Sequence, residues 1–263
     1  MGDQPFLVDC EGSTAILTIN REAQRNSMSF EMWEAFPSHI KELDADPTVR
    51  VIVVTGSGDK AFASGADISE FGSKRTGRDA AALYHRAVEA TMASLEAASK
   101  PVVAMVNGYA LGGGCELAVA CDLRIAGESA SFGIPAARLG LVISFPDTKR
   151  LVDLVGPAIA KEMLMTGRRL PAREALAVGL ANQVAADRLL RQATLEMAET
   201  IAANAPFSVA SSKAMVDHCR RDPGLSAIAA ADADRPLRCY ETEDFREGVK
   251  AFLEKRPPNF TGR

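Results

Sequence analysis

The chain has 263 residues, enough to bury a substantial core as one domain, with or without a helical appendage. Hydrophobic residues make up 47% and charged residues 24%, as in ordinary globular proteins, and a net charge of −4 without a Lys/Arg-rich run argues against nucleic-acid binding. Five cysteines without a C-x-x-C pair indicate reduced thiols of a cytoplasmic protein rather than a disulfide framework or zinc site. We expect neither a signal peptide at residues 1–5 nor a membrane-spanning segment.

The first half of the chain alternates strand and helix patterns. Residues 6–9 and 15–19 predict a β-hairpin, and a helix capped by Ser27 or Ser29 follows, which Pro37 is expected to kink or divide. Further along we predict strands at 51–55, 102–106 and 123–126, and helices at 68–71, 79–98 and 116–120.

Beyond Pro146 the pattern becomes helical, with almost no strand signal. The predicted helices are residues 151–155, 158–165, 172–177, 189–203, 207–219 and 245–252. An α/β architecture with a C-terminal helical region follows from this order. The best boundary is the stretch 202–206, which gives a core at residues 1–203 and a helical region at residues 204–263. The sequence shows no convincing internal repeat.

Two segments rich in small residues, 61–68 and 107–117, each follow an apolar β-branched run and lead toward a helix. Small or missing side chains there leave backbone N–H groups facing outward. Two such donors that converge on one point form an oxyanion hole. A glycine-rich turn that serves packing alone is the competing interpretation, whereas phosphate binding lacks either of its usual glycine motifs.

Few side chains near these segments carry chemistry. Glu116 lies in the first turn of its predicted helix and could exchange a proton beside a polarised carbonyl, although the helix dipole alone also favours a glutamate there. Asp67 is expected to cap the short helix that ends at Gly72. The three histidines have no metal-ligand spacing, and no nucleophile elbow of a serine hydrolase exists.

These features resemble the crotonase family, also called the enoyl-CoA hydratase/isomerase family. The resemblance covers nearly the whole chain and is specific for the family, but much less so for the reaction. It rests on Asn20-Arg21 with Asn26-Ser27 and on the segments 61–68, 101–122, 132–135 and 252–256.

The resemblance implies a crotonase-like spiral of ββα units with a C-terminal helical trimerisation region, assembled as a homotrimer or a dimer of trimers. It implies an acyl-CoA thioester substrate, with no metal, nicotinamide or flavin. The N–H groups of Ala66 and Gly113 would bind the thioester oxygen and stabilise an enolate, while Glu116 would handle the proton. The residues expected to contact the CoA substrate are Arg25, Ala63, Ala66, Asp67, Ile68, Gly113 and, near the phosphates, Lys255.

The chain departs from the family where its hydratases place a second glutamate, directly after the proline that matches Pro135. That position is Ala136 here. Ser144 falls where other members place a catalytic aspartate, and Asp147 could either supply a carboxylate or cap the following helix. A positioned acid or base contributes about a hundred- to ten-thousand-fold in rate, so this loss should cripple two-carboxylate hydration but leave enolate stabilisation intact.

Our leading hypothesis is therefore an enoyl-CoA hydratase/isomerase type of enzyme acting on 2-enoyl-CoA. The alternatives are an isomerase or decarboxylase that needs one base, a non-catalytic acyl-CoA-binding protein, and a purely structural trimer.

Overall fold

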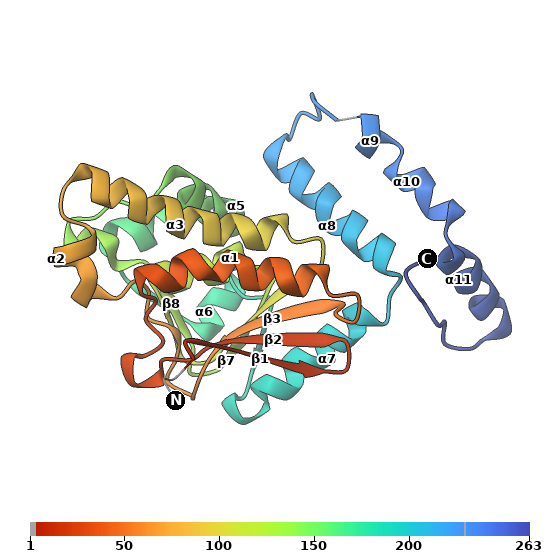
Figure 1. Cartoon of the computed structure of the whole chain (residues 1–263), viewed down its shortest axis with the longest axis horizontal. Helices are drawn as coiled ribbons and strands as arrows, with labels where there is room; N and C mark the ends of the chain where they lie inside the picture. The colour runs from red at the N-terminus through yellow and green to blue at the C-terminus, as the bar shows by residue number, and fades with distance from the viewer. Residues whose placement is uncertain (1–3, 229) are drawn as a thin grey trace.

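The computed structural model describes residues 4–228 and 230–263, so the first three residues of the 1–5 segment examined for a signal peptide lie outside it. A six-stranded sheet with the order β1-β2-β3-β5-β7-β10 forms the centre (Figure 1). The predicted hairpin is confirmed, because β1 pairs with β2 antiparallel, and every later pair in this sheet is parallel. Its strands are Phe6–Glu11, Thr14–Ile19, Val51–Gly56, Val102–Val106, Leu123–Gly127 and Gln183–Ala185.

A second sheet has four short strands in the order β4-β6-β8-β9. They are Ala61–Ala63, Tyr109–Leu111, Ser131–Gly133 and Arg169–Pro171, of which the first three are mutually parallel. Three times along the chain, a strand of the first sheet (β3, β5 or β7) is followed by a strand of the second sheet (β4, β6 or β8) and then by a helix. This is a repeated ββα unit. The repeat is shared by backbone path rather than by side chains, which is why the sequence did not show it.

Helices cover both faces of the six-stranded sheet. The helices in the described parts of the chain are α1 (Phe30–Ala45), α2 (Phe71–Lys74), α3 (Arg78–Ala97), α4 (Gly113–Ala120), α5 (Phe145–Thr166), α6 (Ala172–Ala177), α7 (Leu190–Ala202), α8 (Pro206–Arg221), α9 (Ala230–Ala233), α10 (Arg235–Arg238) and α11 (Glu243–Glu254). Helices α1 and α3 lie side by side on one face, and α7 lies on the other (Figure 1).

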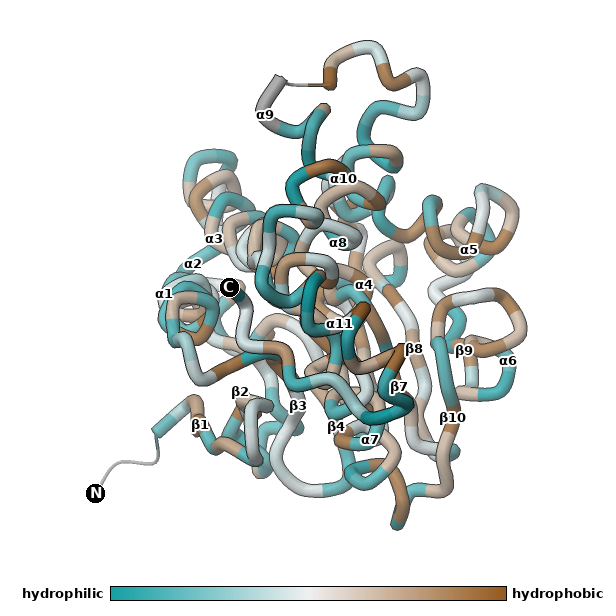
Figure 2. Tube along the Cα trace, turned by 90° about the vertical axis from the view of Figure 1, so that its right-hand side faces the viewer, coloured by the Kyte–Doolittle hydropathy of each residue, from teal (hydrophilic) through white to brown (hydrophobic). Residues whose placement is uncertain are grey.

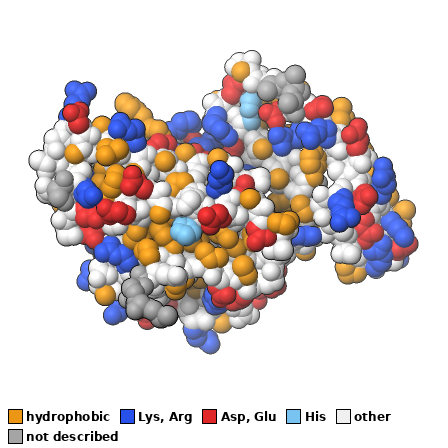
Figure 3. All heavy atoms as spheres, in the orientation of Figure 1, with side chains coloured by type: hydrophobic (Ala, Val, Ile, Leu, Met, Phe, Trp, Pro, Cys, Tyr) orange, Lys and Arg blue, Asp and Glu red, His pale blue; other side chains and the backbone are white. Residues whose placement is uncertain are grey.

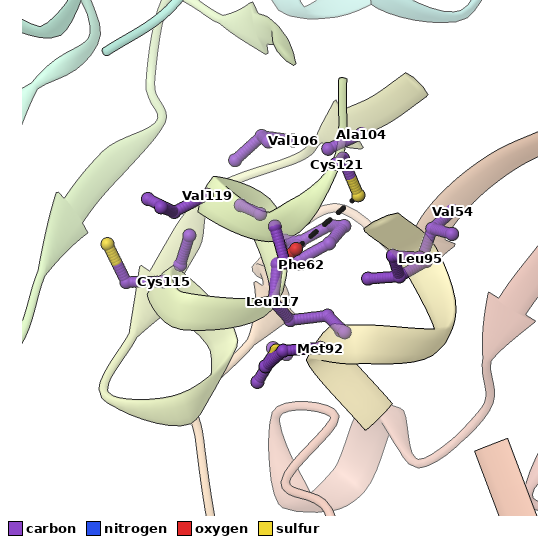
Figure 4. Packing of buried hydrophobic residues seen from close by; sticks show 14 of the residues in the cluster. Val54, Phe62, Met92, Leu95, Ala104, Val106, Cys115, Leu117, Val119 and Cys121 are labelled. Atoms are coloured by element: carbon purple, nitrogen blue, oxygen red, sulfur yellow. Dashed lines mark hydrogen bonds between the residues drawn. The ribbon is translucent and has the colours of Figure 1, made fainter. Parts of the chain in front are cut away.

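The alternation along β3 explains why its apolar run is continuous. Ile52 and Val54 point into the core beneath α1 and α3, whereas Val51 and Val53 pack with α7 on the opposite face. Figure 4 shows the first core, where Leu117 of α4 meets Met92 and the rest of the apolar cluster. Since α4 is anchored this way, the residues at its N-terminus have a fixed position.

Pro37 was expected to kink or divide its helix, but α1 continues through it as one helix. Ser29 caps the helix by accepting from the Met32 amide at 3.3 Å. A proline cannot donate to the carbonyl one turn earlier, which belongs to Trp33. The Thr91 hydroxyl of α3 donates to that oxygen at 2.8 Å instead, so the helix continues.

Several predicted boundaries need correction. All four short strands of the second sheet were missed, including β9 beyond Pro146, and so was β10 of the first sheet, because three residues are too few to show a period. Gly72 lies inside α2 rather than ending a helix. The predicted helices 151–155 and 158–165 join within α5, where Gly156 (φ 72°) marks a kink.

The C-terminal helices α8 to α11 form a group at one end of the molecule (Figure 1). Figure 2 shows hydrophobic and hydrophilic stretches alternating along this group, and its exposed apolar side chains include Val216, Leu237, Phe252 and Leu253. Charges of both signs are interspersed over the face seen in Figure 3. Among the described residues, no helix is long and apolar enough to cross a membrane.

Candidate functional site

A cavity of about 150 Å³ lies where the three parallel strands of the second sheet end. Gly65 and Ala66 follow β4, Gly112 and Gly113 follow β6, and Ala136 follows β8. The carboxyl ends of parallel strands are the usual place for ligands in α/β proteins. The two glycine-containing segments singled out in the sequence thus meet at one cavity.

Two backbone amides face each other on the wall of this cavity. A Cβ atom placed on Gly113 would lie 3.9 Å from the Ala66 nitrogen, and one placed on Gly65 would lie 3.2 Å from the Gly113 nitrogen. The Met28 amide donates to the Gly65 carbonyl, and the Met28 carbonyl accepts from the Asp67 amide, so Met28 and Ala66 form a parallel β-bridge. In such a bridge the N–H of Ala66 itself points away from Met28. Gly113 begins α4, and the first amides of a helix have no partner within it.

Missing side chains allow this close approach. A Cβ on Gly65, whose φ is +97°, would come within 2.7 Å of the Leu111 carbonyl oxygen. A Cβ on Gly114 would come within 2.1 Å of the Ala63 carbonyl oxygen. Contacts this short do not occur in real structures, so the two segments could not pack with larger residues at these positions.

Buried polar groups fix the loop that carries Ala66. The Asn26 amide donates to the carbonyl oxygens of Ala61 (2.6 Å) and Ser57 (2.9 Å). Arg21 donates to the Ser27 carbonyl at 2.8 Å and pairs with Asp67 at 3.0 Å. Asp67 also accepts from the Ser69 amide, as expected for a helix cap. The pairs Asn20-Arg21 and Asn26-Ser27 therefore contribute by positioning backbone.

Glu116 lies in the first turn of α4, as predicted, and its buried side chain lines the cavity. Burial raises the pKa of its carboxyl to about 8, and the negative charge of Asp147 adds to this rise. Arg75 and Arg150 act in the opposite direction. A glutamate in this setting holds a proton near neutral pH and can release it within the working range of an enzyme.

The structure brings a second carboxylate to the same cavity. Ser144 is the cap of α5, since its hydroxyl accepts from the Asp147 amide at 3.1 Å. That hydroxyl donates to the Asp147 carboxylate at 2.6 Å, and Arg150 donates to the other carboxylate oxygen at 2.9 Å. Burial raises the pKa of Asp147, while Ser144 and Arg150 oppose the rise. Both Ser144 and Asp147 line the cavity, so Asp147 faces it without being the cap.

Aromatic side chains and the cation Arg75 also line the cavity. The Trp33 ring would lie 3.1 Å from a Cβ on Gly113, and its indole N–H donates to the Tyr84 hydroxyl at 3.0 Å. The Arg75 guanidinium carbon lies 3.7 Å from the Tyr84 ring centroid and 4.4 Å from that of Phe71.

The predicted substrate contacts divide into two groups. Ala66, Ile68, Gly113 and Glu116 line the cavity, and Ile68 is 62% exposed at its edge. The residues that do not line it are Arg25, Ala63, Asp67 and Lys255. Lys255 lies at the end of α11 in the C-terminal group.

Comparison with known proteins assigns this arrangement to a family. The model of the family described as enoyl-CoA hydratase/isomerase matches residues 9–263. The chain belongs to the enoyl-CoA hydratase/isomerase family. It is 38% identical to the short-chain-enoyl-CoA hydratase of Clostridium acetobutylicum (95% of each chain) and 36% identical to the crotonyl-CoA hydratase of Syntrophomonas wolfei (100% of each).

Solved structures agree with this assignment. An enoyl-CoA hydratase/carnithine racemase from Magnetospirillum magneticum superposes with a TM-score of 0.94 at 33% identity, covering 99% of this chain and 96% of that one. The crotonase fold expected from the sequence is therefore confirmed. The relatives indicate an enzyme of the hydratase/isomerase type.

Sequence reasoning missed part of this family member's cavity. Trp33 and Arg75 line the cavity and Tyr84 contacts both of them; all three come from helices or helix ends and gave no motif. Asp147 and Ser144, by contrast, were both named from the sequence, with Asp147 as either a carboxylate of the site or a helix cap. Among the described residues, no cluster of His, Cys, Asp and Glu is suited to a metal ion.

Proposed function

We propose that this protein processes acyl-CoA thioesters through a stabilised enolate, with hydration of a 2-enoyl-CoA as its reaction. The observation that carries the proposal is that the amides of Ala66 and Gly113, which have no hydrogen-bond partner among the described residues, lie in the same cavity as the buried carboxyl of Glu116. The thioester oxygen accepts from both amides. One such donor is worth roughly 2.7–4 kcal/mol of transition-state stabilisation.

Glu116 and Asp147 divide the proton chemistry. Asp147 takes a proton from water as the water oxygen bonds to the β carbon, and the π electrons move through the α carbon onto the thioester oxygen. When the carbonyl re-forms, the α carbon takes the proton of Glu116. The different surroundings of the two carboxyls support this division: Arg150 and Ser144 favour the ionised form of Asp147, whereas burial favours neutral Glu116.

The remaining substrate contacts follow the family pattern. We propose that Arg25, Ala63, Asp67 and Ile68 lie along the CoA moiety and that Lys255 reaches its phosphates. The reaction requires no metal, nicotinamide or flavin, because groups of the chain supply both the charge stabilisation and the proton transfer.

We further propose a cytoplasmic homotrimer or dimer of trimers built through residues 204–263. The exposed apolar side chains of α8, α10 and α11 support an assembly role for this region, and five free cysteines fit a reducing compartment.

The decisive experiment is hydration of crotonyl-CoA by wild type and by Glu116→Gln and Asp147→Asn. We expect each variant to lose about a hundred- to ten-thousand-fold in kcat. Equal activity of Glu116→Gln and wild type would remove Glu116 from the mechanism. A 3-enoyl-CoA and a malonyl-type thioester assayed in parallel separate hydration from isomerisation and decarboxylation.

A second candidate, a non-catalytic acyl-CoA-binding protein, is favoured by the alanine at position 136 on the cavity wall. It predicts binding without turnover of any thioester. The double variant Ala136→Glu/Asp147→Asn discriminates: regained hydration relative to Asp147→Asn shows a working site in which either position can supply the second carboxylate.

A further inference from the structure

Arg75 is a cation on the cavity wall without an anionic partner. Its Nε is buried and has no hydrogen-bond partner, and no carboxylate within the described parts of the chain forms an ion pair with it. Most other arginines near the cavity are paired, as Arg21 is with Asp67 and Arg150 with Asp147. A half-buried charge without a partner is unfavourable, so its presence calls for an explanation.

Two aromatic faces hold the guanidinium in place. It stacks on the Tyr84 ring at 3.7 Å and on the Phe71 ring at 4.4 Å. Burial lowers the pKa of Arg75, but arginine stays charged in proteins. The planar group is therefore held on the two rings, while its Nε has no hydrogen-bond partner within the described parts of the chain.

A series of contacts links Arg75 to the oxyanion donor Gly113. Gly113, whose amide faces the proposed thioester oxygen, packs under Trp33, which hydrogen-bonds Tyr84, on which Arg75 stacks. Apolar side chains such as Val88 and Ile143 line the same cavity. The cavity therefore offers apolar surface to an acyl chain and a cation to a charged group at the end of that chain.

We propose that the site takes acyl-CoA thioesters whose acyl chain ends in a carboxylate, and that Arg75 binds this terminal carboxylate. The proposal rests on the proposed function for the placement of the thioester. Guanidinium and carboxylate form two parallel charge-assisted hydrogen bonds, which a terminal methyl group cannot replace.

An alternative is that Arg75 only offsets the charge of Glu116, whose pKa it lowers. That role would change the rate or the pH profile for every substrate alike. It would not change the relative affinity for two ligands that differ only at the far end of the chain.

The experiment is calorimetric titration with saturated, non-reacting pairs: succinyl-, glutaryl- and adipyl-CoA against butyryl-, pentanoyl- and hexanoyl-CoA. The variants are Arg75→Gln and Arg75→Lys. Arg78→Met, an exposed position at the start of α3, is the matched control. The readout is the ratio of the two Kd values in a pair, which needs no turnover.

For wild type and Arg78→Met we expect at least one carboxylated ligand to bind about tenfold or more tighter than its methyl-terminated match, as a charge-assisted hydrogen bond provides. Arg75→Gln should lose this preference, and Arg75→Lys should keep part of it. Absence of the preference at every length, or its survival in Arg75→Gln, overturns the inference alone. Failure of all six ligands to bind refutes the proposed function itself.

Discussion

The two walls of the cavity are built in different ways. One wall is backbone: the amides of Ala66 and Gly113, fixed by strand ends, close glycine packing and the hydrogen bonds of Asn26. The other wall is side chains from helices: Glu116 from α4, Asp147 from α5, and Trp33 from α1, which Tyr84 of α3 holds from behind. The first wall suits any thioester carbonyl, whereas the second determines which proton moves and which acyl chain fits.

Of three further changes, the one that breaks the backbone wall is expected to have the largest effect. Gly113→Pro removes one N–H donor, and we expect kcat for crotonyl-CoA to fall about a hundred- to a thousand-fold. Gly113→Ala is the control, because it places a Cβ equally close to Trp33 but keeps the N–H. If both variants lose the same activity, crowding against Trp33 rather than the lost donor is responsible.

A smaller effect is expected on stability when Glu116 is changed. The pKa of Glu116 is about 8 in the folded chain, above its ordinary value of 4.5, so stability decreases as pH rises from 4.5 through 8. Glu116→Gln removes this decrease. Thermal unfolding should show the variant several degrees more stable than wild type at pH 9, with the difference shrinking toward pH 5. A difference independent of pH would contradict the raised pKa.

The smallest effect is expected from Ser144→Ala, which tests how the side-chain wall sets the protonation of Asp147. The variant loses the cap of α5, which typically costs about 1 kcal/mol of stability. It also loses the 2.6 Å hydrogen bond that lowers the pKa of Asp147, so the acidic limb of the pH–rate profile should move to higher pH. Ser144→Thr retains the hydroxyl and should leave that limb in place.

The sequence predicted the backbone wall far better than the side-chain wall. Glycines and small residues after apolar strands are local signals, and they identified the segments 61–68 and 107–117 together with the first-turn position of Glu116, while the family resemblance supplied Ala66 and Gly113 as the two donors. Tyr84 becomes a neighbour of Trp33 only when α1 packs on α3, and Arg75 reaches the Tyr84 ring from the end of α2, which no local pattern encodes. The short strands of the second sheet were missed for the same reason, since they are defined by pairing rather than by period.

Pro37 gives α1 a property that reaches beyond the helix. The carbonyl of Trp33, left without its usual donor, is tied to Thr91 on a different helix, while the indole of the same residue is tied to Tyr84. Trp33 is therefore tethered to α3 at both its main chain and its ring. The hydrogen bond that Pro37 removes within α1 is thus replaced by one that joins α1 to α3. The two bonds together hold the Trp33 ring against Gly113.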